Sequence, residues 1–293
     1  MNIITISNQI KFKMKNKLQH IAETWPDHIT GTLLQNKIKV YWFQKVVNFG
    51  DLITPLILKK SGFTPIHCNR NLSTILLCGS VLQHVSEDYS GYILGSGLIR
   101  DCTRYLNKAK ILGVRGELTR ERVGASKEVV LGDPGLLASI FLKHRPQKSH
   151  SLGIVSHYVD KGDPRVLKIQ KRYKKEVKVI DVQQDPLTVF TEIAKCEHII
   201  SSSLHGLVVA DSLGIPNGWI LLSDQVVGKG FKFADYNSAL GTKQNPLFLS
   251  GDENLMDLLQ HTRKSPESVK EIKEKLKFMF ANLKNYVTTT SFD

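Results

Sequence analysis

The sequence has few cysteines and no long apolar run, and these absences exclude several classes of protein. Cys68, Cys78, Cys102 and Cys196 are scattered, without the close spacing of a zinc site or a redox pair. No segment approaches the ~18 uninterrupted apolar residues of a membrane-spanning helix. The stretch after Met1 also lacks the basic start and cleavage site of a signal peptide. We therefore expect a reduced, cytoplasmic protein that needs no metal.

Acidic residues are scarce relative to basic ones. The chain has 27 Asp and Glu against 40 Lys and Arg, a formal net charge of +13. Such a charge favours an anionic partner: a phosphorylated substrate, a nucleic acid or an anionic lipid surface. No zinc finger, aromatic–basic RNA-binding motif or basic zipper is present, so a nucleic-acid partner is not expected. The basic residues cluster in 11–17, 168–178 and 263–284, each of which reads most simply as a solvated face.

Short apolar runs alternate with longer amphipathic segments throughout the chain. Strands are predicted at 37–43, 64–67, 74–78, 92–94, 110–114, 129–131, 151–156, 177–182, 197–200, 219–222 and 246–249. Helices are predicted at 52–60, 115–123, from Pro134, and at 164–173, 186–196, 204–213, 231–240, 255–261 and 266–286. Short apolar strands bounded by turn residues are typical of a parallel sheet that helices cover on both faces. The predicted class is α/β.

A polar segment divides this alternation into two similar halves. Residues 144–150 have no apolar period and are predicted to be a linker. The pattern predicts two doubly wound domains, 1–145 and 151–293, that face each other across a cleft. The last predicted helix is long enough to cross back onto the first domain.

Three serines and a histidine lie between the strand that ends at Ile200 and the helix that follows. Ser201, Ser202 and Ser203 precede Leu204-His205, so hydroxyls, free backbone N–H groups and an imidazole meet at a helix N-terminus. Such an end binds anions well, and open α/β sheets bind ligands beyond the carboxyl ends of their strands. The alternative is that the serines are ordinary N-caps and the histidine is structural.

Two further strand ends carry candidate binding residues. Gly95-Ser96-Gly97 follows a strand, where small residues let a ligand approach the backbone. The segment lacks the third glycine and the later acidic residue of a dinucleotide fingerprint, and a plain tight turn is the alternative. Arg115 stands where another strand turns into a helix, and its planar guanidinium suits a carboxylate or a phosphate.

Several motifs, taken in order along the chain, resemble those of the polysaccharide pyruvyl transferases. They are Asn48-Phe49-Gly50-Asp51, Gly113-Val114-Arg115, Gly132-Asp133-Pro134-Gly135-Leu136-Leu137, Ser201 to Gly206, Ala210-Asp211 and Gly214-Ile215-Pro216. The segments 231–236 and His157-Tyr158 look like those of members that act on exopolysaccharide or capsule. The resemblance implies two Rossmann-like domains similar to the GT-B glycosyltransferases. It also implies phosphoenolpyruvate as donor, no cofactor, and a product in which pyruvate bridges two hydroxyls of one sugar as a cyclic ketal.

The resemblance also implies roles for particular residues. In the family, arginines and the histidine of a Leu-His pair hold the donor, and these correspond here to Arg115 and to Leu204-His205. Some members have an arginine where this chain has Ser203, so a second donor-binding cation must come from elsewhere. The sequence offers three candidates without ranking them: Arg100, Arg104 and Lys229.

The chemistry of ketal formation suggests how the site residues act. The methylene carbon of the donor needs a proton before a sugar hydroxyl attacks C2, and histidine exchanges protons near neutral pH. We expect His205 to be the general acid/base, or else a charge-assisted donor to the phosphate. The other predicted contacts are Asp133 in catalysis, Asp51 and Asn48 on the acceptor side, and the serines, Leu204, Gly95, Ser96 and His157 on the donor side.

Three functions remain open at this point. The first is pyruvylation of a sugar on a lipid-linked polysaccharide repeat unit, with the basic C-terminal segment attracted to an anionic membrane surface. The second is a GT-B glycosyltransferase with a nucleotide-sugar donor. The third is a non-catalytic carbohydrate- or anion-binding protein on the same scaffold.

Overall fold

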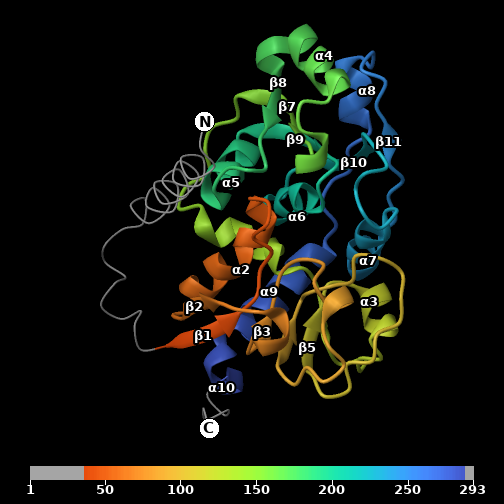
Figure 1. Ribbon diagram of the computed structural model, residues 1–293. Helices are drawn as coiled ribbons and strands as arrows, with labels where there is room; N and C mark the ends of the chain where they lie inside the picture. The colour runs from red at the N-terminus through yellow and green to blue at the C-terminus, as the bar shows by residue number, and fades with distance from the viewer. Residues whose placement is uncertain (1–35, 288–293) are drawn as a thin grey trace, which may run out of the picture.

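The computed structural model describes residues 36–287 as two parallel β-sheets with helices packed around them (Figure 1). The first sheet contains β1 (Lys37–Val40), β2 (Thr64–His67), β3 (Ile75–Leu76), β4 (Tyr92–Leu94), β5 (Lys110–Val114) and β6 (Val130–Leu131). The second contains β7 (His150–Val155), β8 (Val177–Ile180), β9 (Cys196–Ser201), β10 (Asn217–Leu221) and β11 (Leu247–Phe248). The predicted pair of α/β units is confirmed.

The two sheets have the same strand order. The first runs β2-β1-β3-β4-β5-β6, and the second, read from its other edge, runs β8-β7-β9-β10-β11. In both, the first strand lies between the second and the third, and every pairing is parallel. This is a doubly wound order, in which the chain reverses direction across the sheet beside the first strand. Each sheet therefore has one switch point, between β1 and β3 or between β7 and β9.

The helices follow the predicted positions with two differences. They are α2 (Phe49–Lys60), α3 (Glu117–Arg122), α4 (Pro164–Tyr173), α5 (Pro186–Ala194), α6 (Leu204–Leu213), α7 (Phe231–Ala239), α8 (Leu255–Gln260), α9 (Ser268–Ala281) and α10 (Leu283–Val287). The 3₁₀ segments are η2 (Arg70–Leu72), η3 (Leu82–His84), η4 (Pro134–Phe141), η5 (Tyr158–Asp160) and η6 (Lys174–Glu176).

Local side-chain hydrogen bonds account for both differences. The predicted helix from Pro134 is the 3₁₀ segment η4, in which the backbone N–H of Ser139 bonds to the hydroxyl of Ser212 in α6 at 3.0 Å. An α-helix would give that N–H to a carbonyl of its own. The predicted helix 266–286 is interrupted at Asn282, whose side chain donates to the carbonyl of Phe278 at 2.8 Å.

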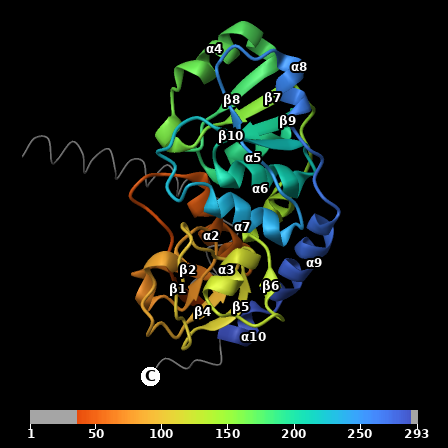
Figure 2. The ribbon, with the colours of Figure 1, turned by 90° about the vertical axis from the view of Figure 1, so that its right-hand side faces the viewer.

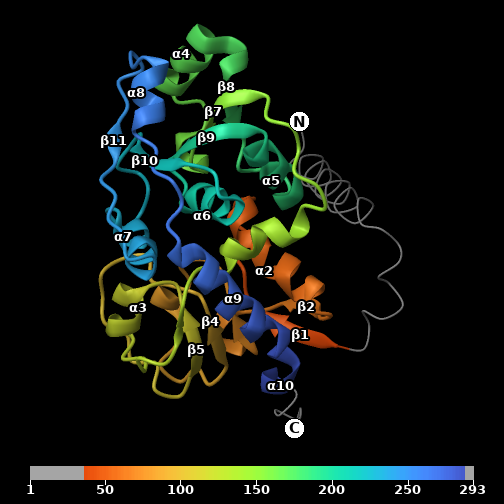
Figure 3. The same cartoon turned by 180° about the vertical axis from the view of Figure 1, so that it is seen from behind.

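Two helices join the sheets. The N-terminal end of α2 is fixed to the second sheet's half, because the N–H of Phe49 donates to the carbonyl of Val182 at 2.8 Å. Helix α9 runs down one side of the molecule from α8 to α10 and lies in front of the first sheet when seen from behind (Figures 2 and 3). Helix α9 packs closely on the first sheet. A Cβ on Gly132 would lie 2.5 Å from the side chain of Ile272, and a Cβ on Gly113 would lie 3.5 Å from the sulfur of Met279. Within residues 36–287, no helix combines the length and apolarity needed to cross a bilayer.

Candidate active site

A cavity of about 360 Å³ lies where the two switch points face each other. Its wall takes residues from the segments that follow β1 and β3 in the first sheet, and β7, β9 and β10 in the second. They are Tyr41, Phe43, Lys45, Asn48, Asp51, Gly79, Ser80, Val81, His157, Tyr158, Ser203, Leu204, His205 and Lys232, with Arg70, His84 and Ile99. Ligands of open α/β sheets bind at such switch points, so this cavity is the candidate active site.

The serines at the end of β9 hold this segment in place by hydrogen bonds. Ser201 donates to the carbonyls of Val155 and Ser203, at 2.8 and 2.7 Å, and accepts from the N–H of Ser203 at 3.0 Å. Ser202 donates to Asp160 at 3.0 Å. Ser201 and Ser202 are buried and do not line the cavity, whereas Ser203 does. The structure therefore places the first two as supports of the turn and the third beside any ligand.

His205 and Asp133 form a buried pair at the back of the cavity. The imidazole Nε2 lies 3.7 Å from Oδ2 of Asp133, and within the described residues neither atom has a hydrogen-bond partner. The other oxygen of Asp133 accepts from the N–H of Gly135 at 2.8 Å, which fixes the carboxylate at the start of η4. Unpaired buried polar atoms cost free energy, and they occur where function requires them. This pair is the strongest chemical feature of the site.

The surroundings of His205 favour the neutral form of its imidazole. Burial lowers the pKa of the imidazole, Lys232 and Arg115 act in the same direction, and Asp133 opposes them. Nε2 is buried, so the exposed tenth of the side chain belongs to its other atoms. A Cβ on Gly50 would lie 2.1 Å from Nδ1, so only glycine leaves room for the ring there. Asp133 can thus orient Nε2, and Gly50 fixes the opposite edge of the ring.

Asp51 and Lys232 place two further titratable groups in the cavity. Burial raises the pKa of Asp51 to about 7, against the opposing effects of Lys232 and of a hydrogen bond with Asn48. Burial also lowers the pKa of Lys232 to about 8, assisted by Arg115 and opposed by Asp51 and Asp160. Both groups therefore change protonation near neutral pH, as acid/base groups and anion-binding groups of enzymes do.

His157 is positioned from β7 through Ser202. Its backbone N–H donates to the Ser202 hydroxyl at 2.9 Å, and its Nδ1 faces the N–H of Val159 at 3.4 Å. The ring stacks on Tyr158 with centroids 4.4 Å apart. Burial lowers the pKa of His157 to about 3, so the ring is neutral. With Nδ1 as acceptor, Nε2 carries the proton and is the group that can donate to a ligand.

Arg115 is fully buried, and protein groups surround its guanidinium. It donates to Asp235 at 2.8 Å, to the Ser80 hydroxyl at 2.6 Å and to the carbonyl of Leu98 at 2.5 Å. It does not line the cavity and reaches the wall only through Ser80. Its predicted contact with the donor stays a prediction, whereas its structural role is visible.

Gly95 and Ser96 also lie outside the cavity wall. The Ser96 hydroxyl is buried and donates to the carbonyl of Gly79 at 2.9 Å. Gly95 has φ +87, and a Cβ there would lie 2.4 Å from the ring of Pro134. This geometry is that of a tight turn which brings β4 close to the start of η4 and so helps to place Asp133.

Sequence reasoning missed Lys232 and Gly50 as separate site residues. Both lie inside segments that carry the family resemblance, 231–236 and 48–51, and this was the available signal. The three cations that the sequence offered for the donor are elsewhere: none of them lines the cavity, and they are Arg100, Arg104 and Lys229. Arg104 instead donates to the carbonyl of Val85 at 2.6 Å.

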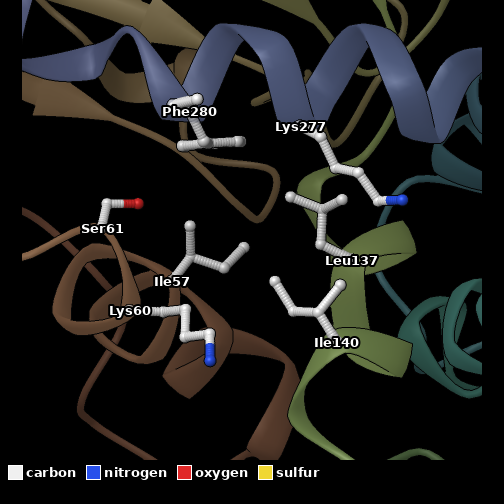
Figure 4. A pocket seen from close by; sticks show the side chains of 8 residues that line it. Ile57, Lys60, Ser61, Leu137, Ile140, Lys277 and Phe280 are labelled. Atoms are coloured by element: carbon white, nitrogen blue, oxygen red, sulfur yellow. The ribbon is translucent and has the colours of Figure 1, made fainter.

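A second hollow of about 240 Å³ lies between α2, η4 and α9 (Figure 4). Its wall is mainly aliphatic, with Ile57, Leu137, Ile140 and Phe280, and two lysines stand at its edge. No histidine or carboxylate lines it, so it offers none of the acid/base chemistry of the first cavity.

Comparison with known proteins identifies the family. A profile described as polysaccharide pyruvyl transferase matches residues 65–223, which includes Asp133, His157 and His205. The chain belongs to the polysaccharide pyruvyl transferase family. Its general activity is therefore the transfer of pyruvate to polysaccharide.

Two relatives illustrate the range of this pyruvyl transferase family. The uncharacterized protein L143 of Acanthamoeba polyphaga mimivirus is 31% identical over 226 residues, which cover 72% of this chain and 77% of that protein. The succinoglycan biosynthesis protein ExoV of Rhizobium meliloti (strain 1021) is 24% identical over 216 residues, 70% of this chain and 66% of that one.

Two solved glycosyltransferase structures are similar to this chain. AviGT4, from avilamycin A biosynthesis, aligns over 88% of this chain and all of its own length with 9% identity and a TM-score of 0.42. An α-glucosyltransferase solved with UDP and DNA aligns over 86% and 99% with 7% identity and a TM-score of 0.32. The description of the fold as two facing α/β units rests on the strand order of this chain itself.

Proposed function

We propose that this pyruvyl transferase uses phosphoenolpyruvate as donor and joins pyruvate to two hydroxyls of one sugar as a cyclic ketal. The observation that carries the proposal is the buried pair of His205 and Asp133 at the back of the cavity between the two sheets. Nε2 of the imidazole lies 3.7 Å from Oδ2 of the carboxylate, and within the described residues neither atom has a hydrogen-bond partner. The acceptor we propose is a sugar of a surface polysaccharide or of its lipid-linked repeat unit.

The first chemical step is protonation of the donor's methylene carbon. A bound polyanion raises the pKa of a nearby imidazole, so His205 takes up a proton when the donor binds. Asp133 stabilises the imidazolium that forms, since apo distances between catalytic groups often shorten in the complex. His205 then gives its proton to the methylene, which becomes a methyl group, and C2 becomes electrophilic.

The remaining steps move two hydroxyl protons. The first sugar hydroxyl attacks C2, and Asp51, with its pKa near 7, accepts the proton. The C2–O bond to phosphate breaks, and the departing phosphate takes that proton. The second hydroxyl then closes the ring on C2 and returns its proton to His205. One proton thus ends on the methyl carbon and one on phosphate, which balances the reaction.

The mouth of the cavity suits a saccharide. Tyr41, Phe43 and Tyr158 line the cavity and offer aromatic groups, and Arg70 stacks over Tyr41 with 4.7 Å from its guanidinium carbon to the ring centroid. Aromatic faces with a few polar groups are typical of sites that bind organic ligands. We assign this mouth to the acceptor and the interior beside His205 to the donor.

The test is release of inorganic phosphate from phosphoenolpyruvate with a panel of galactosides, glucosides and mannosides, some of them lipid-linked. We expect acceptor-dependent release in the wild type and a loss of at least about 100-fold in His205→Ala and Asp133→Asn, the range of general acid–base catalysis. His144→Ala is the matched control, because His144 is exposed in the segment between the sheets.

The alternative enzyme, a glycosyltransferase with a nucleotide-sugar donor, predicts the opposite result. Thermal stabilisation by uridine or guanosine diphosphate, with neither stabilisation nor phosphate release by phosphoenolpyruvate, would overturn the proposal. Phosphate release that persists in His205→Ala would keep the reaction and reject His205 as the acid.

A further inference from the structure

A group of arginines beside the cavity has no carboxylate partner. Most arginines between residues 36 and 287 form ion pairs with acidic side chains, and these are Arg115, Arg120, Arg122, Arg165, Arg172 and Arg263. The arginines of this range that form no ion pair are Arg70, Arg100, Arg104 and Arg145. The first three of them lie around η3. Because a guanidinium is always charged, they leave a local excess of positive charge.

Hydrogen bonds anchor two of these arginines at η3. The guanidinium of Arg104 donates to the carbonyl of Val85, the residue after η3, at 2.6 Å. The backbone N–H of Arg100 donates to the side-chain oxygen of Gln83, within η3, at 3.2 Å. Arg100 is exposed, and in the described part of the chain its guanidinium has no hydrogen-bond partner. The guanidinium of Arg104 is thus engaged with the backbone, whereas that of Arg100 is available to a ligand.

Arg70 reaches the same place from η2. It lines the cavity together with His84, the last residue of η3. Its guanidinium lies over the ring of Tyr41 and donates to the Tyr41 hydroxyl at 3.3 Å, so the planar group is held in one orientation. Partial burial lowers the pKa of His84, and the charges of all three arginines act in the same direction. The arginines therefore gather around one exposed imidazole at the edge of the cavity.

The acidic residues near this group are directed elsewhere. Asp101 pairs with Arg122 at 2.6 Å, and Asp88 pairs with Lys108 at 2.7 Å. Glu87 is exposed, and within residues 36–287 it forms no ion pair with any of the three arginines. A cleft edge lined by charge of one sign attracts ligands of the opposite charge. The group therefore indicates an anionic ligand.

The position of the group favours the acceptor over the donor. The donor is assigned to the interior beside His205, whereas the arginines belong to the first half and border the solvent. A sugar that carries a phosphoester would extend from the interior to this edge. One guanidinium fork satisfies a carboxylate, but a phosphate or diphosphate has oxygens and charge for several. Arginine clusters are a recurrent means of phosphate recognition.

We propose that Arg70 and Arg100 bind a phosphate or diphosphate on the acceptor, with the charge of Arg104 behind them. The acceptor is then a saccharide attached through a phosphoester, and not a neutral glycan. This inference rests on the proposed function for the reaction and names the class of its acceptor. It assigns recognition of the acceptor's charge to η2, η3 and the segment after β4, apart from the pair of His205 and Asp133.

Acceptor kinetics test the inference. Phosphate release from phosphoenolpyruvate is measured with the 1-phosphates of galactose, glucose and mannose and with the methyl glycosides of the same sugars. For the sugar that is used, we expect the KM of the 1-phosphate to be at least tenfold lower. Arg70→Met and Arg100→Met should each raise that KM at least tenfold and leave the KM of the methyl glycoside and of phosphoenolpyruvate within about twofold. A merely structural role would move all three constants.

Arg145→Met is the matched control, because Arg145 is exposed in the segment between the sheets and is another arginine without an ion pair among the described residues. Thermal melts check that each variant is folded. A polyprenyl diphosphate saccharide, assayed beside the 1-phosphates, distinguishes a lipid-linked from a soluble phosphoester, and the use of either should depend on Arg70 and Arg100.

Two results would separate the failure of this inference from that of the reaction. Equal KM values for the 1-phosphate and the methyl glycoside in the wild type would overturn the inference and leave the proposed reaction standing. No phosphate release with any acceptor, together with no thermal stabilisation by phosphoenolpyruvate, would overturn both.

Discussion

At the residue scale, Gly50 sets the position of the His205 imidazole. Gly50 lies in the first turn of α2 against the His205 ring, where a Cβ would be 2.1 Å from Nδ1. Alanine is otherwise favoured over glycine inside a helix by about 1 kcal/mol. We expect Gly50→Ala to keep the fold and to lower acceptor-dependent phosphate release about 100-fold, because the imidazole is displaced from Asp133.

A second glycine provides the control for this substitution. Gly124 has φ +63 and open space around it, so Gly124→Ala should cost about 1–2 kcal/mol of stability and leave phosphate release unchanged. Wild-type activity in a folded Gly50→Ala protein would show that the imidazole position is not critical.

The sequence was informative about site residues at strand ends and less so about those elsewhere. Asn48, Asp51, His157 and His205 follow predicted strands, and the structure brings all four to one cavity. Lys232 was not singled out, because it is one of 40 lysines and arginines and its position depends on how α7 docks. The burial of Arg115 was equally invisible, since a strand end can face a cleft or the interior.

At the scale of elements, the contact between α3 and α7 joins the two halves of the site. Arg115 and Asp235 form an ion pair in which both side chains are fully buried. Removing one partner of such a pair leaves a buried charge without compensation and costs about 3–5 kcal/mol. We expect Asp235→Ala to lower the unfolding free energy by this amount in urea titrations, with Asp224→Ala, an exposed aspartate, unchanged.

The double variant separates pairing from general damage. Arg115→Met combined with Asp235→Ala should cost less than the sum of the two single changes, because no unpaired charge remains. Strict additivity would contradict a coupled pair. The unfolding free energy of Arg115→Met alone also shows whether any loss of activity in that variant arises from the fold.

The helices and strands were largely predictable, because the spacing of apolar residues along the sequence is regular in most of them. Short apolar runs became parallel strands, and Gly214, with φ +68, ends α6 in the left-handed conformation that glycine allows. The 3₁₀ winding of η4 was not predictable, since its cause is a hydroxyl from α6, 73 residues further along the chain.

At the scale of the whole molecule, the net charge of +13 bears on where the enzyme works. Several lysines of α9 are engaged: Lys273 donates to Ser139 and Ser212, while Lys275 and Lys277 pair with Glu271 and Glu274. Attraction to an anionic surface should therefore be modest. We expect the protein to sediment with anionic vesicles at low salt and to be released at ~0.5 M salt, where screening is strong.

Neutral vesicles are the control for this measurement. Failure to sediment with anionic vesicles at low salt would remove the proposed membrane contact and leave the chemistry untouched.

The two-part architecture was predictable from the repeated alternation on either side of 144–150. The facing of the two switch points was not predictable, because it depends on how α2, α7 and α9 pack against elements of the other half.

The chain passes between the two sheets twice, once through 142–149 and again through 261–267, ahead of α9. Buried apolar residues of both halves also form one cluster, in which the rings of Phe49 and Phe190 meet edge to face. Because the halves share this core, we expect them to unfold together in a single cooperative transition.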